Sequence, residues 1–131
     1  MDSGTTDTFL SHKIAKVFHI AWAKLVGRKY TNQLQLYTYE QFMKLPIIAL
    51  ELDGGSQWDV RPEAYMEAYT TTDATVSNRS APWQGKRGFT SRIYVDEPNG
   101  AVLGSNFMMD HEVYFDTANR RIGIARSSCQ F

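Results

Sequence analysis

The sequence predicts a single, mainly β domain with one substantial helix near its N-terminus. Its length of 131 residues is typical of one domain, and its 43% hydrophobic and 21% charged residues are typical of a globular protein. A helical repeat of apolar residues occurs in one long segment, whereas the other apolar runs are short and separated by turn residues. Because the formal net charge is zero, we expect no nucleic-acid partner. No apolar run is long enough to predict a transmembrane segment.

The helix is predicted from about Ser11 to Val26. Ser11 can cap its start, and Gly27 suits the left-handed conformation that often follows a helix end. Apolar residues recur at spacings of three and four, and we expect them to form one face that packs on a sheet: Ile14, Val17, Phe18, Ala21 and Leu25.

Shorter elements are predicted in the middle of the chain. Ile47 to Leu52 is a dense apolar run that favours a mostly buried strand, and a glycine turn joins it to a return strand over Gln57 to Arg61. Tyr39 to Leu45 and Pro62 to Met66 each fit a short helical turn, because a proline follows the first and begins the second.

Thr70 to Gly88 is rich in Thr, Ser, Asn, Gly and Pro, and it predicts a long loop with Trp83 as its one large anchor. Within it, Asn78 begins an Asn-Arg-Ser triplet that matches the N-glycosylation acceptor pattern. The pattern has a meaning only if the protein is secreted.

The C-terminal third predicts strands joined by turns. Phe89 to Val95 is β-rich, and Asp96 to Gly100 is a strong turn. A small buried strand, a helical turn and two further strands follow: Ala101 to Leu103, Ser105 to Asp110, Val113 to Phe115 and Ile122 to Ala125. The basic pairs Lys86-Arg87 and Arg120-Arg121 fall in predicted turns, where we expect them to be solvated.

The sequence offers no metal or cofactor site. His12 and His19 lie about two turns apart on the predicted helix, and no Cys or acidic cluster completes a zinc pattern with them or with His111. We interpret all three as solvated or structural. Cys129, the single Cys, has neither a helix start nor a neighbouring His that would activate it. It is a free thiol or half of a bond to something outside this chain.

The segment Asp2-Ser3-Gly4-Thr5-Thr6 is the strongest candidate for chemistry. Taken alone, Asp-Ser-Gly is a turn tripeptide. A carboxylate on a tight glycine turn flanked by hydroxyls is also what acid proteolysis requires. Glycine lets the backbone approach closely, and the hydroxyls can hold the carboxylate oxygens.

With this segment and five further motifs, the chain resembles the C-terminal lobe of a pepsin-like, two-lobed aspartic protease. Asp2 to Thr5 matches the catalytic Asp-[Ser/Thr]-Gly-Thr motif of that lobe. The further motifs follow in the family's order and extend the match over nearly the whole chain: Leu45-Pro46-Ile47-Ile48-Ala49-Leu50, Pro62-Glu63-Ala64-Tyr65-Met66, Leu103-Gly104-Ser105-Asn106-Phe107-Met108, Val113-Tyr114-Phe115-Asp116 and Arg121-Ile122-Gly123-Ile124-Ala125.

The resemblance implies an aspartic-type endopeptidase that uses no cofactor and activates a water between two Asp, one from each lobe. Asp2 corresponds to the second-lobe Asp, and Thr5 to the residue that hydrogen-bonds it. Ser3 corresponds to the residue that bonds across to the other lobe, and Gly4 and Thr6 to positions that bind the peptide backbone. The strand behind the catalytic turn corresponds to Val102, Leu103 and Gly104.

The departures from the family pattern limit the expected activity. Residues 1–131 correspond to the C-terminal lobe, and the N-terminal lobe with its own Asp and flap is absent. We therefore expect the chain to act on a peptide or protein substrate together with an N-terminal lobe, and to have little or no activity alone. By the same resemblance, Cys129 either pairs with a Cys upstream of Met1 or is a free thiol. The family also implies a secretory, vacuolar or lysosomal, or extracellular location.

Two other functions stay open at this point. In retroviral-type aspartic proteases two identical short chains each supply one Asp, which would explain a single motif. A pepsin-like fold can also be kept for binding after catalysis is lost. The association state of the chain and the coding sequence upstream of Met1 discriminate between these alternatives.

Overall fold

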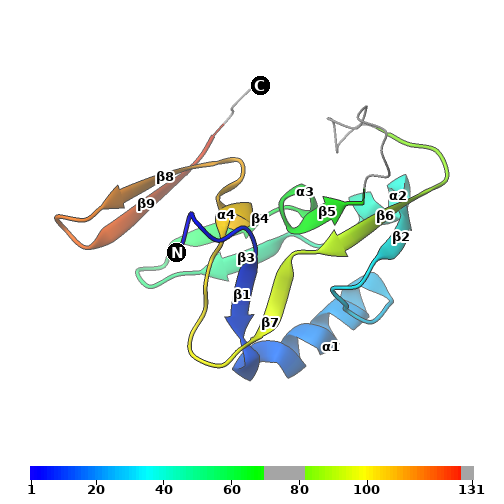
Figure 1. The fold of residues 1–131 in the computed structure, drawn as a ribbon, viewed down its shortest axis with the longest axis horizontal. Helices are drawn as coiled ribbons and strands as arrows, with labels where there is room; N and C mark the ends of the chain where they lie inside the picture. Colours follow the sequence, from blue (N-terminus) through cyan, green and yellow to red (C-terminus); the bar gives the residue numbers. More distant parts are fainter. Residues whose placement is uncertain (70–81, 128–131) are drawn as a thin grey trace.

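The computed structural model describes residues 1–69 and 82–127, and short strands make up most of its regular structure (Figure 1). The strands are β1 (Thr8–Ser11), β2 (Gln35–Thr38), β3 (Ile48–Glu51), β4 (Gln57–Val60), β5 (Met66–Ala68), β6 (Lys86–Ser91), β7 (Ile93–Glu97), β8 (His111–Asp116) and β9 (Arg121–Arg126). The helices are η1 (His12–Ile14), α1 (Ala15–Val26), α2 (Tyr39–Met43), α3 (Pro62–Tyr65) and α4 (Ser105–Met108). The mainly β class with one substantial helix is confirmed. Asn78 and Cys129 lie outside the described residues, as does most of the predicted loop.

In the described part of the chain the strands form several small sheets. β2, β6 and β5 make an antiparallel sheet with β6 in the centre, and β3–β4 and β8–β9 are hairpins. β1 pairs in parallel with β7, so that Thr8 lies opposite Ile93. This parallel pair brings the N-terminal segment beside the C-terminal third (Figure 1). Within residues 1–69 and 82–127, no helix is long and apolar enough to cross a bilayer.

The core is dominated by aromatic side chains. Phe42 from α2 is completely buried and stacks on Phe89 of β6, with ring centroids 4.6 Å apart. Large aromatic side chains bury much apolar surface per residue, so a small domain gains most of its hydrophobic stabilisation from them. The other large side chains that are fully buried are Trp58, Tyr37, Tyr65 and Phe107.

The predicted helix is confirmed, but the expectation for its buried face is wrong. Gly27 takes the expected left-handed conformation at φ 78°, and the Ser11 side chain accepts a bond from the Lys13 N–H in η1. The side chain that α1 buries is Trp22, with Phe18 and Val26 packed beside it. Trp22 and Phe18 both contact the buried ring of Tyr30. The aromatic face therefore packs inward, because it buries more area than the aliphatic face beside it.

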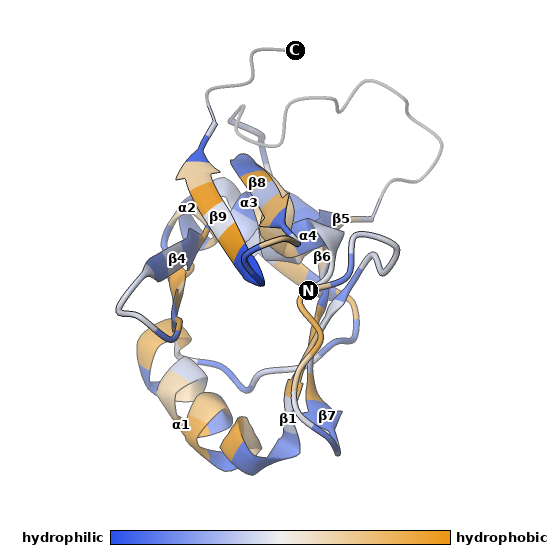
Figure 2. Ribbon diagram, turned by 90° about the vertical axis from the view of Figure 1, so that its left-hand side faces the viewer, coloured by the Kyte–Doolittle hydropathy of each residue, from blue (hydrophilic) through white to orange (hydrophobic). Residues whose placement is uncertain are grey.

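The aliphatic residues that we expected to pack on a sheet are mostly exposed instead. Ile14, Val17 and Leu25 are all exposed, and Phe18 is the one member of the predicted face that joins the core cluster. Apolar residues lie on two neighbouring faces of α1, so spacing alone did not identify the buried one (Figure 2).

Several short strands were not predicted. β1, β2 and β5 pair with strands distant in sequence, and β2 buries the side chain of Tyr37 alone. Strands of this kind are stabilised by pairing with distant strands, and a local sequence pattern carries no information about that pairing. Lys86 to Gly88 belong to β6 and not to a loop. The expected strand at Ala101 to Leu103 is reduced to a single bridge between Val102 and Phe9.

Other local predictions are confirmed with small shifts of boundary. The hairpin β3–β4, the short helices α2, α3 and α4, and the hairpin β8–β9 all lie where the sequence predicts them. β3 is less buried than expected, because its residues alternate between half-buried and exposed.

The basic pairs are less free than expected. Arg87 lies in β6 with its guanidinium 4.9 Å from the centre of the Trp83 ring, and Arg121 forms an ion pair with Asp116 at 2.7 Å. Arg120 lies in the turn, as predicted, with φ 51°.

Truncation of the central aromatic pair tests the core. We expect Phe42→Ala to destabilise the protein by about 3–5 kcal/mol, because it leaves a cavity against Phe89. Its neighbour on α2, Met43, is 51% exposed, so Met43→Ala is the matched control with a change below about 0.5 kcal/mol. Urea unfolding measures both, and similar losses for the two variants would contradict this description of the core.

Candidate active site

Asp2 begins a tight turn that holds its own carboxylate. The Gly4 N–H donates to Oδ1 at 2.9 Å, and the Thr5 hydroxyl donates to Oδ2 at 2.6 Å. The Thr5 N–H closes the turn onto the Asp2 carbonyl at 3.3 Å. A Cβ on residue 4 would lie 3.2 Å from Oδ1, so glycine leaves the carboxylate room. The turn therefore orients an exposed carboxylate with two donors.

Both donors favour the ionised carboxylate. The Thr5 hydroxyl, and after it the Gly4 N–H, lower the pKa of Asp2 below its ordinary value. The carboxylate consequently stays charged to a lower pH than that of an unfolded chain. The stability that these bonds contribute is present above the ordinary Asp pKa and is lost as the pH falls through the lowered one.

The segment from Val102 to Asn106 supports this turn from behind. The Asp2 N–H donates to the Leu103 carbonyl at 3.0 Å, and the Ser105 N–H donates to the Thr5 carbonyl at 2.7 Å. Between these bonds the backbone at Gly104 approaches so closely that a Cβ there would lie 2.0 Å from the carbonyl oxygen of Asp7. Residues 102–104 thus pass directly beside the turn, where the resemblance placed them.

A buried polar network continues from this contact into the domain. Thr8 is fully buried; its hydroxyl donates to Asn106 Oδ1 at 2.7 Å and accepts from the Gly104 N–H at 3.0 Å. The Asn106 side-chain amide donates to the Arg92 carbonyl at 3.1 Å. The Arg92 guanidinium pairs with Asp7 at 2.8 Å. Each side chain of this network therefore has a hydrogen-bond or ion-pair partner, which avoids the cost of an unsatisfied buried group.

The sequence motifs assign no function to these network residues. Thr8 lies two residues after the Asp2 segment and Asn106 lies inside the Leu103–Met108 motif, so their place in or beside these motifs was the available signal. Their pairing across the domain is visible only in the tertiary structure.

The structure brings some of the predicted site residues together and leaves others apart. Asp2, Gly4 and Thr5 form one hydrogen-bonded unit. Ser3 and Thr6 are exposed, and their proposed contacts with a partner lobe and with bound peptide stay predictions. A hollow beside the turn is lined by Thr6, Asp7, Glu67, Arg92, Ser105 and Asn106.

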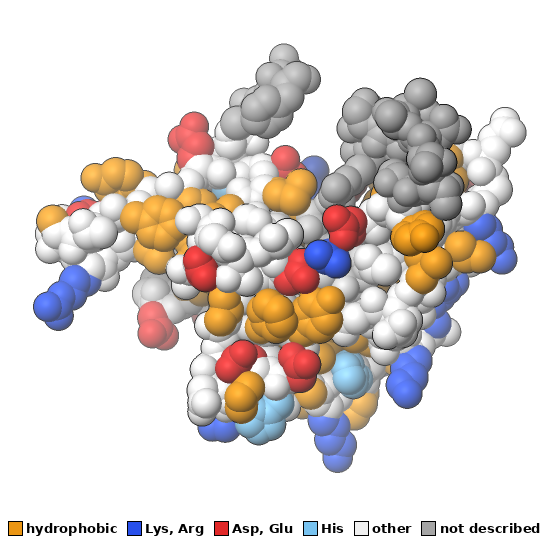
Figure 3. All heavy atoms as spheres, viewed as in Figure 1, with side chains coloured by type: hydrophobic (Ala, Val, Ile, Leu, Met, Phe, Trp, Pro, Cys, Tyr) orange, Lys and Arg blue, Asp and Glu red, His pale blue; other side chains and the backbone are white. Residues whose placement is uncertain are grey.

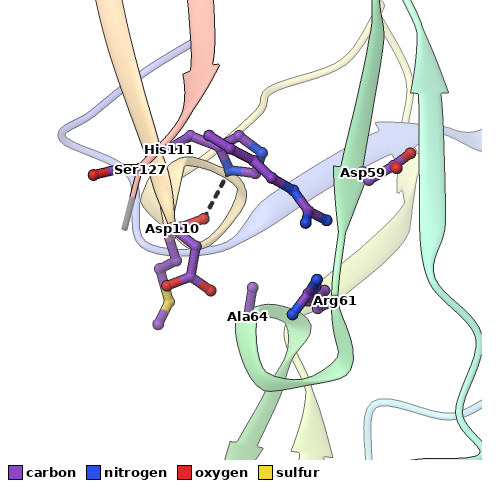
Figure 4. A pocket seen from close by; sticks show the side chains of 8 residues that line it. Asp59, Arg61, Ala64, Asp110, His111 and Ser127 are labelled. Atoms are coloured by element: carbon purple, nitrogen blue, oxygen red, sulfur yellow. Dashed lines mark hydrogen bonds between the residues drawn. The ribbon is translucent and has the colours of Figure 1, made fainter. Parts of the chain in front are cut away.

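A second hollow lies at the start of the β8–β9 hairpin and does not include Asp2 (Figure 4). Asp59 and Arg61 line one side of it, and Asp110 and His111 line the other. The ring of His111 donates from Nδ1 to the carbonyl of Met109 at 2.8 Å. Side chains of both signs face this hollow, and none of them belongs to the predicted site.

No group of His, Cys, Asp and Glu that could hold a metal occurs in the described ranges. His12 and His19 lie apart from the Asp2 turn. His12 contacts the Glu97 carbonyl, and His19 stacks on Tyr30.

A model of the family described as Xylanase inhibitor C-terminal matches residues 1–126. The chain belongs to this family. The Xylanase inhibitor C-terminal family is the C-terminal domain of the pepsin-like aspartic protease fold, which confirms both the resemblance and the fold inferred from the sequence. A comparison with curated proteins gave no match.

The close backbone approach at Gly104 of this Xylanase inhibitor C-terminal domain can be tested by adding a side chain at that position. Gly104→Ala inserts a Cβ into the Asp7 backbone, and we expect it to destabilise the domain by about 1–3 kcal/mol or more. Gly123→Ala is the matched control, because its nearest neighbour would be a side-chain atom at 3.7 Å. Thermal unfolding of the two variants decides: equal midpoints would show that the approach is not tight.

The Thr5 hydroxyl is the main cause of the lowered pKa of Asp2. Thr5→Val removes this donor, so the pKa of Asp2 should rise toward its ordinary value. Thr6→Val is the control, because the Thr6 side chain makes no bond to Asp2. Carbon-detected NMR of the Asp2 carboxyl measures the titration directly, and an unchanged midpoint in Thr5→Val would refute this account.

Proposed function

We propose that the chain is the C-terminal lobe of an aspartic-type endopeptidase and supplies one of its two catalytic carboxylates, Asp2. The observation that carries this proposal is the Asp2 turn, in which an exposed carboxylate is oriented by the Gly4 N–H and the Thr5 hydroxyl. Family membership supports the proposal at the level of the fold.

One carboxylate is not enough for this reaction. Two carboxyl groups in close contact cannot both ionise easily, so they share one proton; the charged member activates a water and the neutral member protonates the substrate carbonyl. The hydrogen bonds to Asp2 lower its pKa and favour its ionised form, so Asp2 suits the part of the charged carboxyl. The second carboxyl has to come from a partner lobe, and we therefore expect little or no turnover by residues 1–131 alone.

The hairpin β8–β9 supports the need for such a partner. It extends away from the rest of the domain (Figure 1), and it exposes the large apolar side chains of Tyr114, Phe115 and Ile122. Exposed apolar groups gathered on one element are typical of a surface that another polypeptide covers. We propose that the N-terminal lobe of the same protease covers it.

A non-catalytic binding role is the second candidate, and the family description favours it. Members of the Xylanase inhibitor C-terminal type include inactive inhibitors. For this chain the role would be recognition of a protein without peptide hydrolysis. The two candidates differ in whether Asp2 has a function.

A symmetric homodimer is the third alternative, and the family match makes it less suitable, because the matched family forms one lobe of a two-lobed fold. Sedimentation of the isolated chain tests it: a tight dimer with acid protease activity would favour the homodimer over the two-lobed enzyme. The same proposal implies a secretory, vacuolar or lysosomal, or extracellular location, which a fusion to a fluorescent protein would test.

The activity test uses the longest natural polypeptide that contains residues 1–131, beside the 131-residue chain alone. We expect the longer protein to cleave peptides at acidic pH, and Asp2→Asn to reduce kcat by about a thousandfold or more, because it removes one of two acting carboxyls.

Asp96→Asn is the matched control, since Asp96 is an exposed carboxylate on β7, outside the Asp2 turn. Full activity in Asp2→Asn would exclude the enzyme, and protein binding that survives Asp2→Asn without any turnover would support the inhibitor-like candidate. Cleavage by the 131-residue chain alone that Asp2→Asn abolishes would overturn the need for a partner lobe.

A further inference from the structure

The outward face of α1 exposes large aliphatic side chains. Val17 and Leu25 are 70% exposed, Ile20 is 60% exposed and Ile14 is 44% exposed. The helix lies at the lower edge of the molecule in both ribbon views, with orange segments along its length (Figure 2). The core side of the helix is already filled by Phe18 and Trp22, so these aliphatic groups have no place in the domain's own core.

The same face is strongly basic, although the whole chain is neutral. No Asp or Glu occurs between Thr8 and Tyr39, whereas five basic residues do: Lys13, Lys16, Lys24, Arg28 and Lys29. Lys13, Val17, Ile20 and Lys24 follow one another at spacings of four, three and four, so they form one row along the helix. In the space-filling view, blue side chains border the lower right of the molecule, where α1 lies (Figure 3).

The charged and polar groups placed near this row lie at its two ends. Asp96 and Glu97 of β7 lie beside η1 at the start of the helix, where the Glu97 carbonyl contacts His12. At the other end, Gln41 and Lys44 face Leu25 across a hollow. Arg28 is occupied, since it donates to the Leu36 carbonyl and lies over the Tyr37 ring. Within residues 1–69 and 82–127 the lysines of this face form no ion pair, so they are the cations that can meet a partner surface.

We propose that this outward face of α1 docks on an anionic lipid bilayer surface. A surface that accepts aliphatic groups and bears negative charge complements the face in both respects. A second copy of the chain does not, because two such faces would bring lysines against lysines. The proposal is independent of whether Asp2 is catalytic.

The docked helix lies parallel to the membrane plane. Val17 and Ile20 enter the boundary between headgroups and acyl chains, and the stems of Lys16 and Lys24 extend beside them so that the ammonium groups reach the lipid headgroups. Both contributions are needed, because one short apolar row or a few lysines alone give weak, reversible binding.

Vesicle co-sedimentation of the 131-residue chain tests the proposal. We expect binding to mixed phosphatidylcholine and phosphatidylserine vesicles, little binding to phosphatidylcholine alone, and loss of binding at high salt. The double variants V17Q/I20Q and K16Q/K24Q should each weaken binding roughly tenfold or more, the first by removing apolar contact and the second by removing charge. The four replaced side chains are exposed, so circular dichroism should show an unchanged fold.

The matched controls lie on the β8–β9 hairpin. Y114Q/I122Q removes two exposed apolar side chains and R120Q/R126Q removes two exposed cations, and both should bind vesicles as the unaltered chain does. Asp2→Asn should also bind normally. Equal binding to both kinds of vesicle would overturn the proposal. So would unchanged binding by either α1 variant, or self-association through this face that the α1 variants abolish.

Discussion

The backbone of Gly104 passes residues 5–7 at a distance that leaves no space for a side chain, and the candidate site depends on this contact. The approach allows the Ser105 N–H to bond the Thr5 carbonyl and the Asp2 N–H to bond the Leu103 carbonyl. The segment from Leu103 to Ser105 thus bonds the turn at both Asp2 and Thr5, so the carboxylate of Asp2 has a defined orientation.

The polar network behind the turn stabilises this close backbone contact. A close backbone approach buries polar groups, and each must be bonded or the domain loses stability. Thr8 and Asn106 bond the groups at the contact, and the Arg92–Asp7 ion pair closes the network at its half-buried edge. Rigid support of this kind is what a preorganised carboxylate requires, whether its role is hydrolysis or recognition.

Two exposed apolar regions of this domain carry the two proposed contacts with other surfaces. The β8–β9 hairpin carries aromatic and aliphatic side chains away from the core, and α1 carries aliphatic side chains among lysines. Their chemistry differs: the hairpin presents a paired backbone and large rings, while the helix presents aliphatic groups with cations. The hairpin suits contact with a partner polypeptide, and the outward face of α1 suits the proposed contact with the anionic headgroups and acyl chains of a bilayer.

Motifs and local patterns in the sequence were enough to identify the family, the Asp2 turn, the C-terminal end of the helix and the two hairpins, because each depends on residues that are neighbours in the chain. The tertiary structure alone decided which side of α1 is buried, since Trp22 and Phe18 pack on Tyr30, which lies outside the helix. It also decided the pairings of β1, β2 and β5 and the Thr8–Asn106 bond. These strand pairings and this hydrogen bond join residues distant in sequence, and each stabilises the fold only when its distant partner is in contact.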